Sequence, residues 1–217
     1  MEKNGKRIWL TGSMLLIGFV IWTVLIQTVD VQPIGQNGTL VGFATFNSWF
    51  HKLTNVHMTI YNVTDWLGLV PIIICMIFAG VGFSQFVKRS KVDYDIIVLG
   101  IYYIIVIFNY LIFEMIPINY RPILIEGIME TSYPSSTTLL VLSVMPTLVF
   151  QVNRRVKNVA AKKIICMLTI IFSAFMVIGR LVSGVHWFTD IIGSVMLSSG
   201  LFCIYKAIVI SCYRKKD

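Results

Sequence analysis

The chain has 217 residues, of which 57% are hydrophobic and 13% charged, and its formal net charge at pH 7 is +8. A soluble domain is about 45–50% apolar and about 25% charged, so a soluble fold of this length could not bury so much apolar surface. Disorder is excluded as well, because disordered chains are poor in apolar residues and rich in charge. The composition predicts an integral membrane protein.

Six segments approach the roughly 20 apolar residues that a helix needs to cross a bilayer. We therefore expect an all-α fold, a bundle of six transmembrane helices that forms a single membrane domain over residues 1–217. The predicted spans are approximately 8–29, 66–86, 96–113, 137–152, 164–179 and 188–210. The first span is longer than the apolar core of a secretory signal and no convincing cleavage site follows it, so an uncleaved anchor is expected.

Lysine and arginine are distributed unequally between the predicted loops. Three lie on one side: Lys52, Arg121 and Arg180. Fifteen lie on the other: Lys3, Lys6, Arg7, Lys88, Arg89, Lys91, Arg154, Arg155, Lys157, Lys162, Lys163, Lys206, Arg214, Lys215 and Lys216. Because positive residues are retained in the cytoplasm, both termini are predicted to be cytoplasmic. This topology accounts for the basic charge without a nucleic acid partner, and the six-span form is typical of a bacterial plasma membrane protein.

Neither a metal nor another cofactor is expected. The four cysteines lie in spans or near the cytoplasmic end, with a spacing that does not suit zinc: Cys75, Cys166, Cys203 and Cys212. The outer loops contain no compact group of metal ligands, and Arg180 beside His186 would repel a cation. A glycine-rich loop of the kind that binds nucleotides is also missing.

The first outer loop, residues 30–65, is the longest polar stretch of the sequence. Its aromatic residues Phe43, Phe46, Trp49 and Phe50 are expected to lie in the membrane interface on an amphipathic helix.

Two of the three outer basic residues occupy short connections between spans. Arg121 comes after the third span, and Arg180 closes the fifth. One interpretation is that both reach lipid headgroups and pair with acidic neighbours, the candidates being Glu126, Glu130 and Asp190. The other is a phosphate site, because guanidinium groups bind phosphate in bidentate fashion and stay charged at any relevant pH.

Two further motifs favour the phosphate site. Ser135 and Ser136 begin the fourth span, where they either cap the helix or bind an anion at its positive end. His186 and Asp190 are four residues apart, so they share one helical face if the sixth span begins there. The carboxylate would then accept the imidazole N–H and leave the other nitrogen free to attack phosphorus. A purely structural histidine is the alternative.

From the second span onward the chain resembles the type 2 phosphatidic acid phosphatase superfamily, the lipid phosphate phosphatases, which are related in site geometry to vanadium haloperoxidases. The family pattern is lysine, six residues, Arg-Pro; then Pro-Ser-Gly-His; then Ser-Arg, five residues, His, three residues, Asp. The third part matches at Arg180, His186 and Asp190, and the chain also has Arg121-Pro122 and Pro134-Ser135. The resemblance implies hydrolysis of a phospholipid or isoprenoid phosphate through a phosphohistidine at His186, oriented by Asp190. The residues expected to bind the phosphate are Arg121, Ser135, Ser136 and Arg180.

The chain departs from this pattern at four positions. Glu114 stands where the lysine is expected, Ser136 and Thr137 replace the Gly-His pair, and Gly179 precedes Arg180. The resemblance makes the missing histidine the general acid and the missing lysine a phosphate ligand. A general acid contributes about 10²–10⁴-fold and matters most for a poor leaving group such as an alkoxide. Because a diphosphate expels phosphate instead, we expect polyprenyl diphosphate to be preferred over phosphatidic acid.

The first outer loop contains groups that could replace the missing ones. His57 or His51 would act as the acid and Lys52 as the phosphate ligand if the loop folds over the site; otherwise all three are solvated loop residues.

Three functions remain open at this point. The first is a metal-independent lipid phosphate hydrolase, which the pair of His186 and Asp190 favours. The second is a protein of the same fold that binds or transports lipid phosphates without turnover, which the loss of the acid and the lysine favours. The third is a structural scaffold with a residual motif. The oligomeric state is not predicted.

Overall fold

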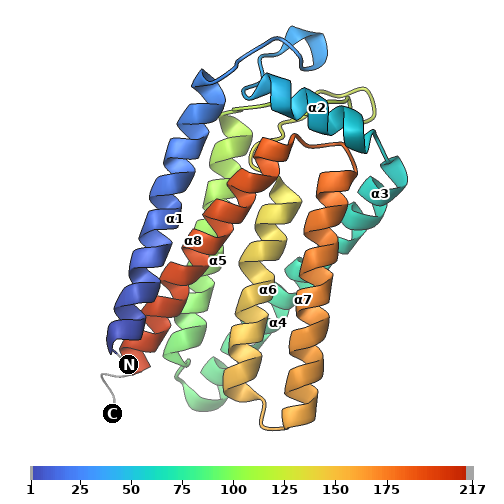
Figure 1. Ribbon diagram of the computed structural model, residues 1–217. Helices are drawn as coiled ribbons and strands as arrows, with labels where there is room; N and C mark the ends of the chain where they lie inside the picture. Colours follow the sequence, from blue (N-terminus) through green and yellow to red (C-terminus); the bar gives the residue numbers. More distant parts are fainter. Residues whose placement is uncertain (1, 214–217) are drawn as a thin grey trace.

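Eight α-helices, labelled α1 to α8 in Figure 1, make up most of residues 2–213, the part of the chain that this computed structural model describes. Their bounds are α1 Glu2–Thr28, α2 Ala44–Thr54, α3 Met58–Leu67, α4 Leu69–Arg89, α5 Tyr94–Met115, α6 Ser136–Arg155, α7 Val159–Val182 and α8 Phe188–Tyr213. A 3₁₀ turn, η1 (Gln36–Gly38), lies between α1 and α2. Within the described range there is no β-strand, in agreement with the predicted all-α class. Arg214, Lys215 and Lys216, which entered the orientation argument, lie outside the described residues.

Six of the described helical segments are long and apolar enough to cross a membrane: α1, the continuous pair α3–α4, α5, α6, α7 and α8. The helices α6 and α7 are 20 and 24 residues long, so they extend beyond the predicted spans 137–152 and 164–179. The predicted spans stopped at polar residues, whereas a helix continues through such residues because its backbone hydrogen bonds are satisfied within the segment. The polar ends of both helices therefore belong to the bundle, and Arg180 lies in the last turn of α7.

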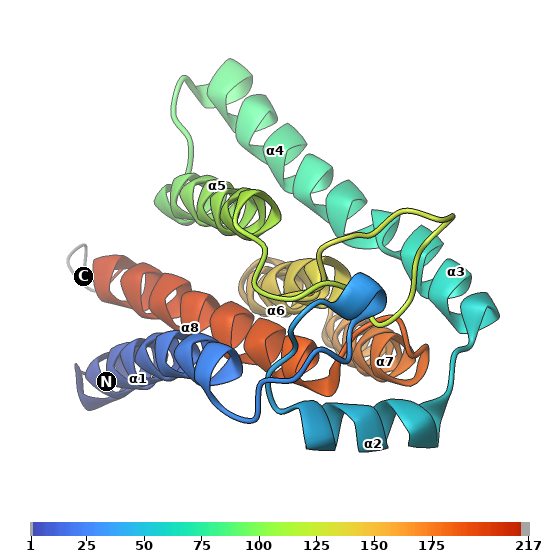
Figure 2. The same cartoon turned by 90° about the horizontal axis from the view of Figure 1, so that it is seen from above.

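The spans pack around α6, which is the most buried of the six within the described residues. Figures 1 and 2 show α1 lying along α8, while α4 diverges from α5 and α6. Close contact between α1 and α8 depends on small residues, since a Cβ atom on Gly12 would lie 3.0 Å from the carbonyl oxygen of Gly200. Such small-residue contacts are typical of helix pairs in membranes.

Two segments cover the upper end of the bundle as drawn in Figure 1, opposite the end at which α1 begins and α8 finishes. Helix α2 lies across this end and exposes Phe46, Trp49 and Leu53, so the amphipathic helix expected in the first loop is present. The connection 116–135 between α5 and α6 folds back on itself through the isolated bridges Tyr120–Thr131 and Ile125–Ile128. The upper end therefore gathers the loops that contain the predicted site residues.

Candidate functional site

His186, Asp190, Arg121 and Arg180 converge at the upper end of the bundle. His186 lies in the loop between α7 and α8, Asp190 in the first turn of α8, and Arg121 in the connection 116–135. The ring of Tyr61, from α3, lies between the two arginines: its centroid is 5.6 Å from Cζ of Arg121 and 4.8 Å from Cζ of Arg180. All four site residues are at most 7% exposed. Three separate stretches of sequence thus form one buried cluster.

The His186 imidazole is oriented by a backbone carbonyl. Its Nδ1 lies 3.1 Å from the carbonyl oxygen of Ser132 and 3.8 Å from Oδ2 of Asp190. Because a carbonyl oxygen only accepts hydrogen bonds, Nδ1 carries the proton and Nε2 keeps its lone pair. Nε2 is buried and has no hydrogen-bond partner among the described residues. This tautomer leaves Nε2 free to act as a nucleophile.

Asp190 organises the loop around the histidine more than it binds the ring itself. Its Oδ2 accepts the backbone N–H of Trp187 at 2.9 Å, and its Oδ1 accepts the side-chain amide of Asn119 at 3.1 Å. The imidazole and this carboxylate are 3.8 Å apart, longer than a hydrogen bond, because α8 begins at Phe188 and His186 lies outside the helix; the orienting role of Asp190 stays a prediction. Asn119 is a contributor that the sequence did not reveal; it links the 116–135 connection to α8.

Arg180 is buried against α3 and α6. Its Nη2 donates to Oδ1 of Asp65 at 2.9 Å and also to the hydroxyl of Thr137, which occupies the position expected for the missing family histidine. None of the anticipated partners Glu126, Glu130 and Asp190 pairs with it; the carboxylate comes from Asp65 instead. Asp65 stands just before the second predicted span. It is 115 positions from Arg180 in the sequence, so its neighbours do not indicate this pairing.

Arg121 pairs with Glu130, as the headgroup interpretation anticipated, with an Nη2–Oε2 distance of 3.0 Å. The arginine nevertheless does not reach outward, since only 8% of its side chain is exposed. Burial of a guanidinium that keeps unused donors is costly, so this arrangement favours a site over a headgroup contact.

Unpartnered polar atoms gather at this cluster. Seven buried side-chain nitrogen or oxygen atoms in the described residues lack a hydrogen-bond partner, and four of them are Nε and Nη1 of Arg121, Nε of Arg180 and Nε2 of His186. Each such group costs about 1–3 kcal/mol when it is buried without a partner. A tetrahedral oxyanion would supply acceptors for the three guanidinium donors, whereas the lone pair of Nε2 needs a donor or an electrophile such as phosphorus. The cluster is therefore equipped to bind a phosphate group.

The two predicted serines have different environments. Ser135 is fully buried, and its hydroxyl donates to Oγ1 of Thr138 at 3.1 Å. Ser136 is the first residue of α6 and is partly exposed. The N–H groups in the first turn of α6 have no helical acceptors, and Thr137 in that turn contacts Arg180. The expected anion-binding helix end is thus close to the cluster.

The three residues proposed as replacements in the first loop lie apart from the unpartnered donors. His51, on α2, contacts the site loop: its Nε2 lies 3.0 Å from the carbonyl oxygen of Gly184, and its ring centroid lies 5.6 Å from that of Trp187. Lys52 and His57 are exposed. The loop does cover the site loop, while the roles of His51, His57 and Lys52 as acid or ligand stay predictions.

The residues just after α2 also contact the site loop. The backbone N–H of His57 donates to the carbonyl oxygen of Ser183 at 3.0 Å. Gly184 has a φ of +70°, and a Cβ atom there would lie 2.0 Å from the carbonyl oxygen of Asn55. Only glycine fits this turn, because the left-handed conformation and the close approach both exclude a side chain.

Gly184→Ala is therefore expected to destabilise the loop by about 1–3 kcal/mol and to lower catalytic efficiency with it. Thermal unfolding in detergent and phosphate release from a lipid phosphate measure the two effects. Gly100→Ala is the matched control, since a Cβ atom at this helical position meets nothing within 4 Å. Equal stability and activity of both variants would contradict the close contact with Asn55.

The acid–base state of His186 leads to a second expectation. Burial lowers the pKa of His186 from 6.5 to about 4; Asp190 opposes this shift, and the charge of Arg121 adds to it. Between these two values the unfolded chain binds more protons than the folded one, so this residue makes stability rise with pH across that window. The imidazole therefore remains neutral well below the pH at which a solvated histidine is protonated.

If His186 is the group whose titration limits activity, we expect kcat/KM at pH 5.5 to lie within about twofold of its value at pH 7. A profile of kcat/KM against pH, with protein integrity checked at each point, measures this. An acidic limb centred near pH 6.5 would indicate a solvated imidazole and contradict the burial.

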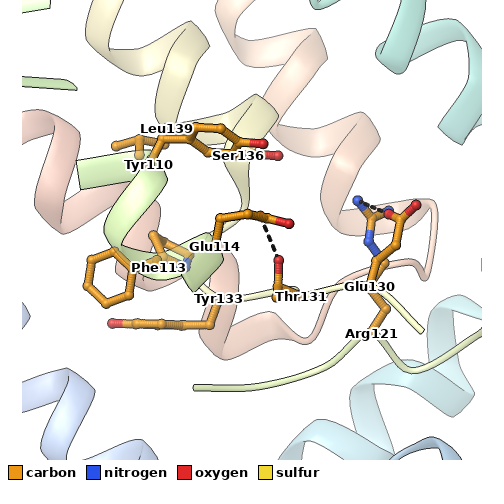
Figure 3. Close-up of a pocket in the computed structure, with 10 residues that line it drawn as sticks. Tyr110, Phe113, Glu114, Arg121, Glu130, Thr131, Tyr133, Ser136 and Leu139 are labelled. Atoms are coloured by element: carbon orange, nitrogen blue, oxygen red, sulfur yellow. Dashed lines mark hydrogen bonds and ion pairs between the residues drawn. The ribbon is translucent and has the colours of Figure 1, made fainter. Parts of the chain in front are cut away.

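Two adjoining cavities open beside the cluster. A polar pocket of about 220 Å³ is lined by Arg121, Glu130, Glu114 and Thr131 among others, and Figure 3 shows the bonds that join these residues in pairs. An apolar groove of about 540 Å³ runs between α4, α5 and α6 and has Asp65 and Thr137, the partners of Arg180, in its lining. Both cavities share Tyr110, Ser136 and Leu139 in their walls, so a polar head and an apolar chain could lie side by side. No group of three or more metal-ligating side chains was found within the described residues.

Comparison with known proteins agrees with this architecture. The sequence profile of the PAP2 superfamily matches residues 96–214, which is more than half of the chain and includes all four clustered residues. In fold the chain is similar to the crystal structure of a transmembrane PAP2-type phosphatidylglycerolphosphate phosphatase from Bacillus subtilis, with a TM-score of 0.68. The two chains are 16% identical, and the match covers 93% of this chain and 96% of the other. No curated protein sequence matches the chain.

Proposed function

The chain belongs to the PAP2 superfamily, and from this premise we propose that it hydrolyses a lipid phosphate or polyprenyl diphosphate through a phosphohistidine at His186. The observation that carries the proposal is the set of buried, unpartnered donors of Arg121 and Arg180 beside the free Nε2 of His186. A mere anion site needs the guanidinium groups but not an imidazole whose lone pair is directed to the same place. The family and the fold support a membrane lipid phosphatase in general.

The reaction would proceed in two displacements. Nε2 of His186 attacks phosphorus, and the bond between phosphorus and the leaving oxygen breaks with its electron pair passing to that oxygen, which takes up a proton. Water then attacks the phosphohistidine, so that inorganic phosphate leaves and the imidazole is restored. Arg121, Arg180 and the N-terminus of α6, with Ser135 and Ser136, would stabilise the charge on the phosphoryl oxygens. Asp190 would hold the loop that presents His186.

The proposed setting is a bacterial plasma membrane, with both termini in the cytoplasm and the site facing outward. Support comes from the distribution of lysine and arginine, since Lys52, Arg121 and Arg180 are the basic residues of the upper end. A lipid substrate fits this placement, because the apolar groove beside the site lies between helices that cross the membrane.

The proposal is tested by comparing substrates with different leaving groups. Thr137 bonds to Arg180 and has no acidic proton to donate, so a substrate that expels phosphate should react faster than one that expels an alkoxide. Phosphate release by the purified protein, in the presence of a metal chelator, is expected to be at least about tenfold faster with polyprenyl diphosphate than with phosphatidic acid. Equal or reversed rates would remove this argument, and no release from either lipid would favour the alternative function.

The alternative is a family member that binds or transports lipid phosphates with impaired turnover. Thr137 and Glu114 favour it, because they stand where the family pattern has its general acid and a phosphate-binding lysine. Lipid phosphate binding without phosphate release, abolished in Arg121→Ala and in Arg180→Ala, would identify this function.

A further inference from the structure

Glu114 lines the polar pocket without a cationic partner. It lies in the last turn of α5, where the negative end of the helix dipole disfavours a carboxylate. Its Oε2 accepts the hydroxyl of Thr131 at 2.8 Å, and no salt bridge to Glu114 occurs within the described part of the chain. Figure 3 shows this carboxylate turned toward Thr131 rather than toward Arg121. The carboxylate is exposed and is thus available to a cationic ligand in the pocket.

The only cation in the lining of this pocket, Arg121, is already paired with Glu130. Two carboxylates and one guanidinium give the lining a formal excess of one negative charge. The same guanidinium is buried and keeps Nε and Nη1 unpartnered, which indicates an anionic ligand on its free edge. Arg121, a guanidinium with unused donors, and Glu114, a carboxylate that can accept a cation, thus line the same small pocket.

We propose that this pocket selects a lipid phosphate that bears an ammonium group on the carbon next to the phosphate ester, with Glu114 as the residue that recognises the ammonium. This inference rests on the proposed function, because it places the phosphate of the same substrate against Arg121 and His186. A vicinal amine lies only a few bonds from phosphorus, which suits a pocket of about 220 Å³. The alkyl chain of the substrate occupies the apolar groove, which shares Tyr110, Ser136 and Leu139 with the pocket.

The carboxylate of Glu114 also repels the second phosphate group of a diphosphate substrate. A diphosphate carries additional negative charge into a lining that is already acidic, so Glu114 slows a reaction that the leaving group favours. Removal of this charge should therefore change the two substrate classes in opposite directions.

Two substrates that differ in one group test the proposal: 2-aminooctadecyl phosphate and octadecyl phosphate. The wild-type protein is expected to release phosphate from the amine with roughly tenfold higher kcat/KM, as a charge-assisted hydrogen bond implies. Glu114→Gln keeps the shape and an acceptor for Thr131 but removes the charge, so the preference disappears while hydrolysis of octadecyl phosphate continues. The same variant hydrolyses polyprenyl diphosphate severalfold faster than the wild type.

Glu126→Gln is the matched control, because it removes one negative charge from the exposed tip of the same connection, outside the pocket lining. It should retain the preference for the amine. The proposal is overturned if the wild-type protein treats both octadecyl substrates alike, or if Glu114→Gln keeps the preference. If neither lipid is hydrolysed, the phosphatase function fails instead, and the ratio of the two dissociation constants in the wild type and in Glu114→Gln then decides the selectivity in the same way.

Discussion

His186→Ala is expected to abolish phosphate release, with a fall in kcat of roughly a thousandfold or more. The variant removes the proposed attacking atom, whereas the proposed phosphate ligands Arg121, Arg180 and the N-terminus of α6 remain. Affinity for a non-hydrolysable lipid phosphonate should therefore change by less than about tenfold. Both quantities are measured on protein purified in the same detergent.

The fold of this variant needs its own control, because His186 is buried and its Nδ1 donates to the carbonyl oxygen of Ser132. His186→Gln preserves a hydrogen-bond donor at that place and should be equally inactive. A similar unfolding temperature for wild type and His186→Gln, together with unchanged turnover, would refute the assignment of the nucleophile.

Arg180→Lys is the second change with a large expected effect. Arginine at this position contacts Asp65, Thr137 and the ring of Tyr61 at once, and its Nε has no partner among the described residues. Lysine retains the charge but lacks the planar set of donors, so it cannot hold Asp65 and the phosphoryl oxygens together. We expect kcat/KM to fall by roughly a hundredfold, which is the effect of losing one donor to the charge that develops in the transition state.

Arg89→Lys serves as the control for this substitution, since Arg89 is exposed at the end of α4, on the lower end of the bundle. It should leave kcat/KM unchanged. Activity of Arg180→Lys close to that of the wild type would show that the guanidinium does not bind the reacting phosphate and is only a structural partner of Asp65.

The sequence was sufficient for the fold class and for the residues that meet at the upper end. Apolar segments of membrane-spanning length depend on composition alone, so all six spans could be located, although their ends could not. Arg121 belongs to one short motif, and Arg180, His186 and Asp190 belong to another. Each motif can be recognised from neighbouring residues, and the family profile covers both. These features needed no knowledge of packing.

The contacts that complete the site could not be predicted in the same way. Ser132 contacts His186 through its carbonyl oxygen, and Asn119 contacts Asp190 through its side-chain amide. Both lie in a non-helical connection, whose sequence has no periodicity from which their positions could be predicted. Asp65 reaches Arg180 across more than a hundred residues, so composition near either residue does not indicate the pair. The acidic pocket depends on how α5 ends beside the connection 116–135, which only the assembled structure reveals.

A structure of the protein with orthovanadate bound would test the central claim most directly. We predict vanadium bonded to Nε2 of His186, with its oxygen atoms accepting hydrogen bonds from the free guanidinium edges of Arg121 and Arg180. Vanadate bound elsewhere, or bound at the arginines with His186 turned away from it, would contradict the claim that these groups act together on one phosphate.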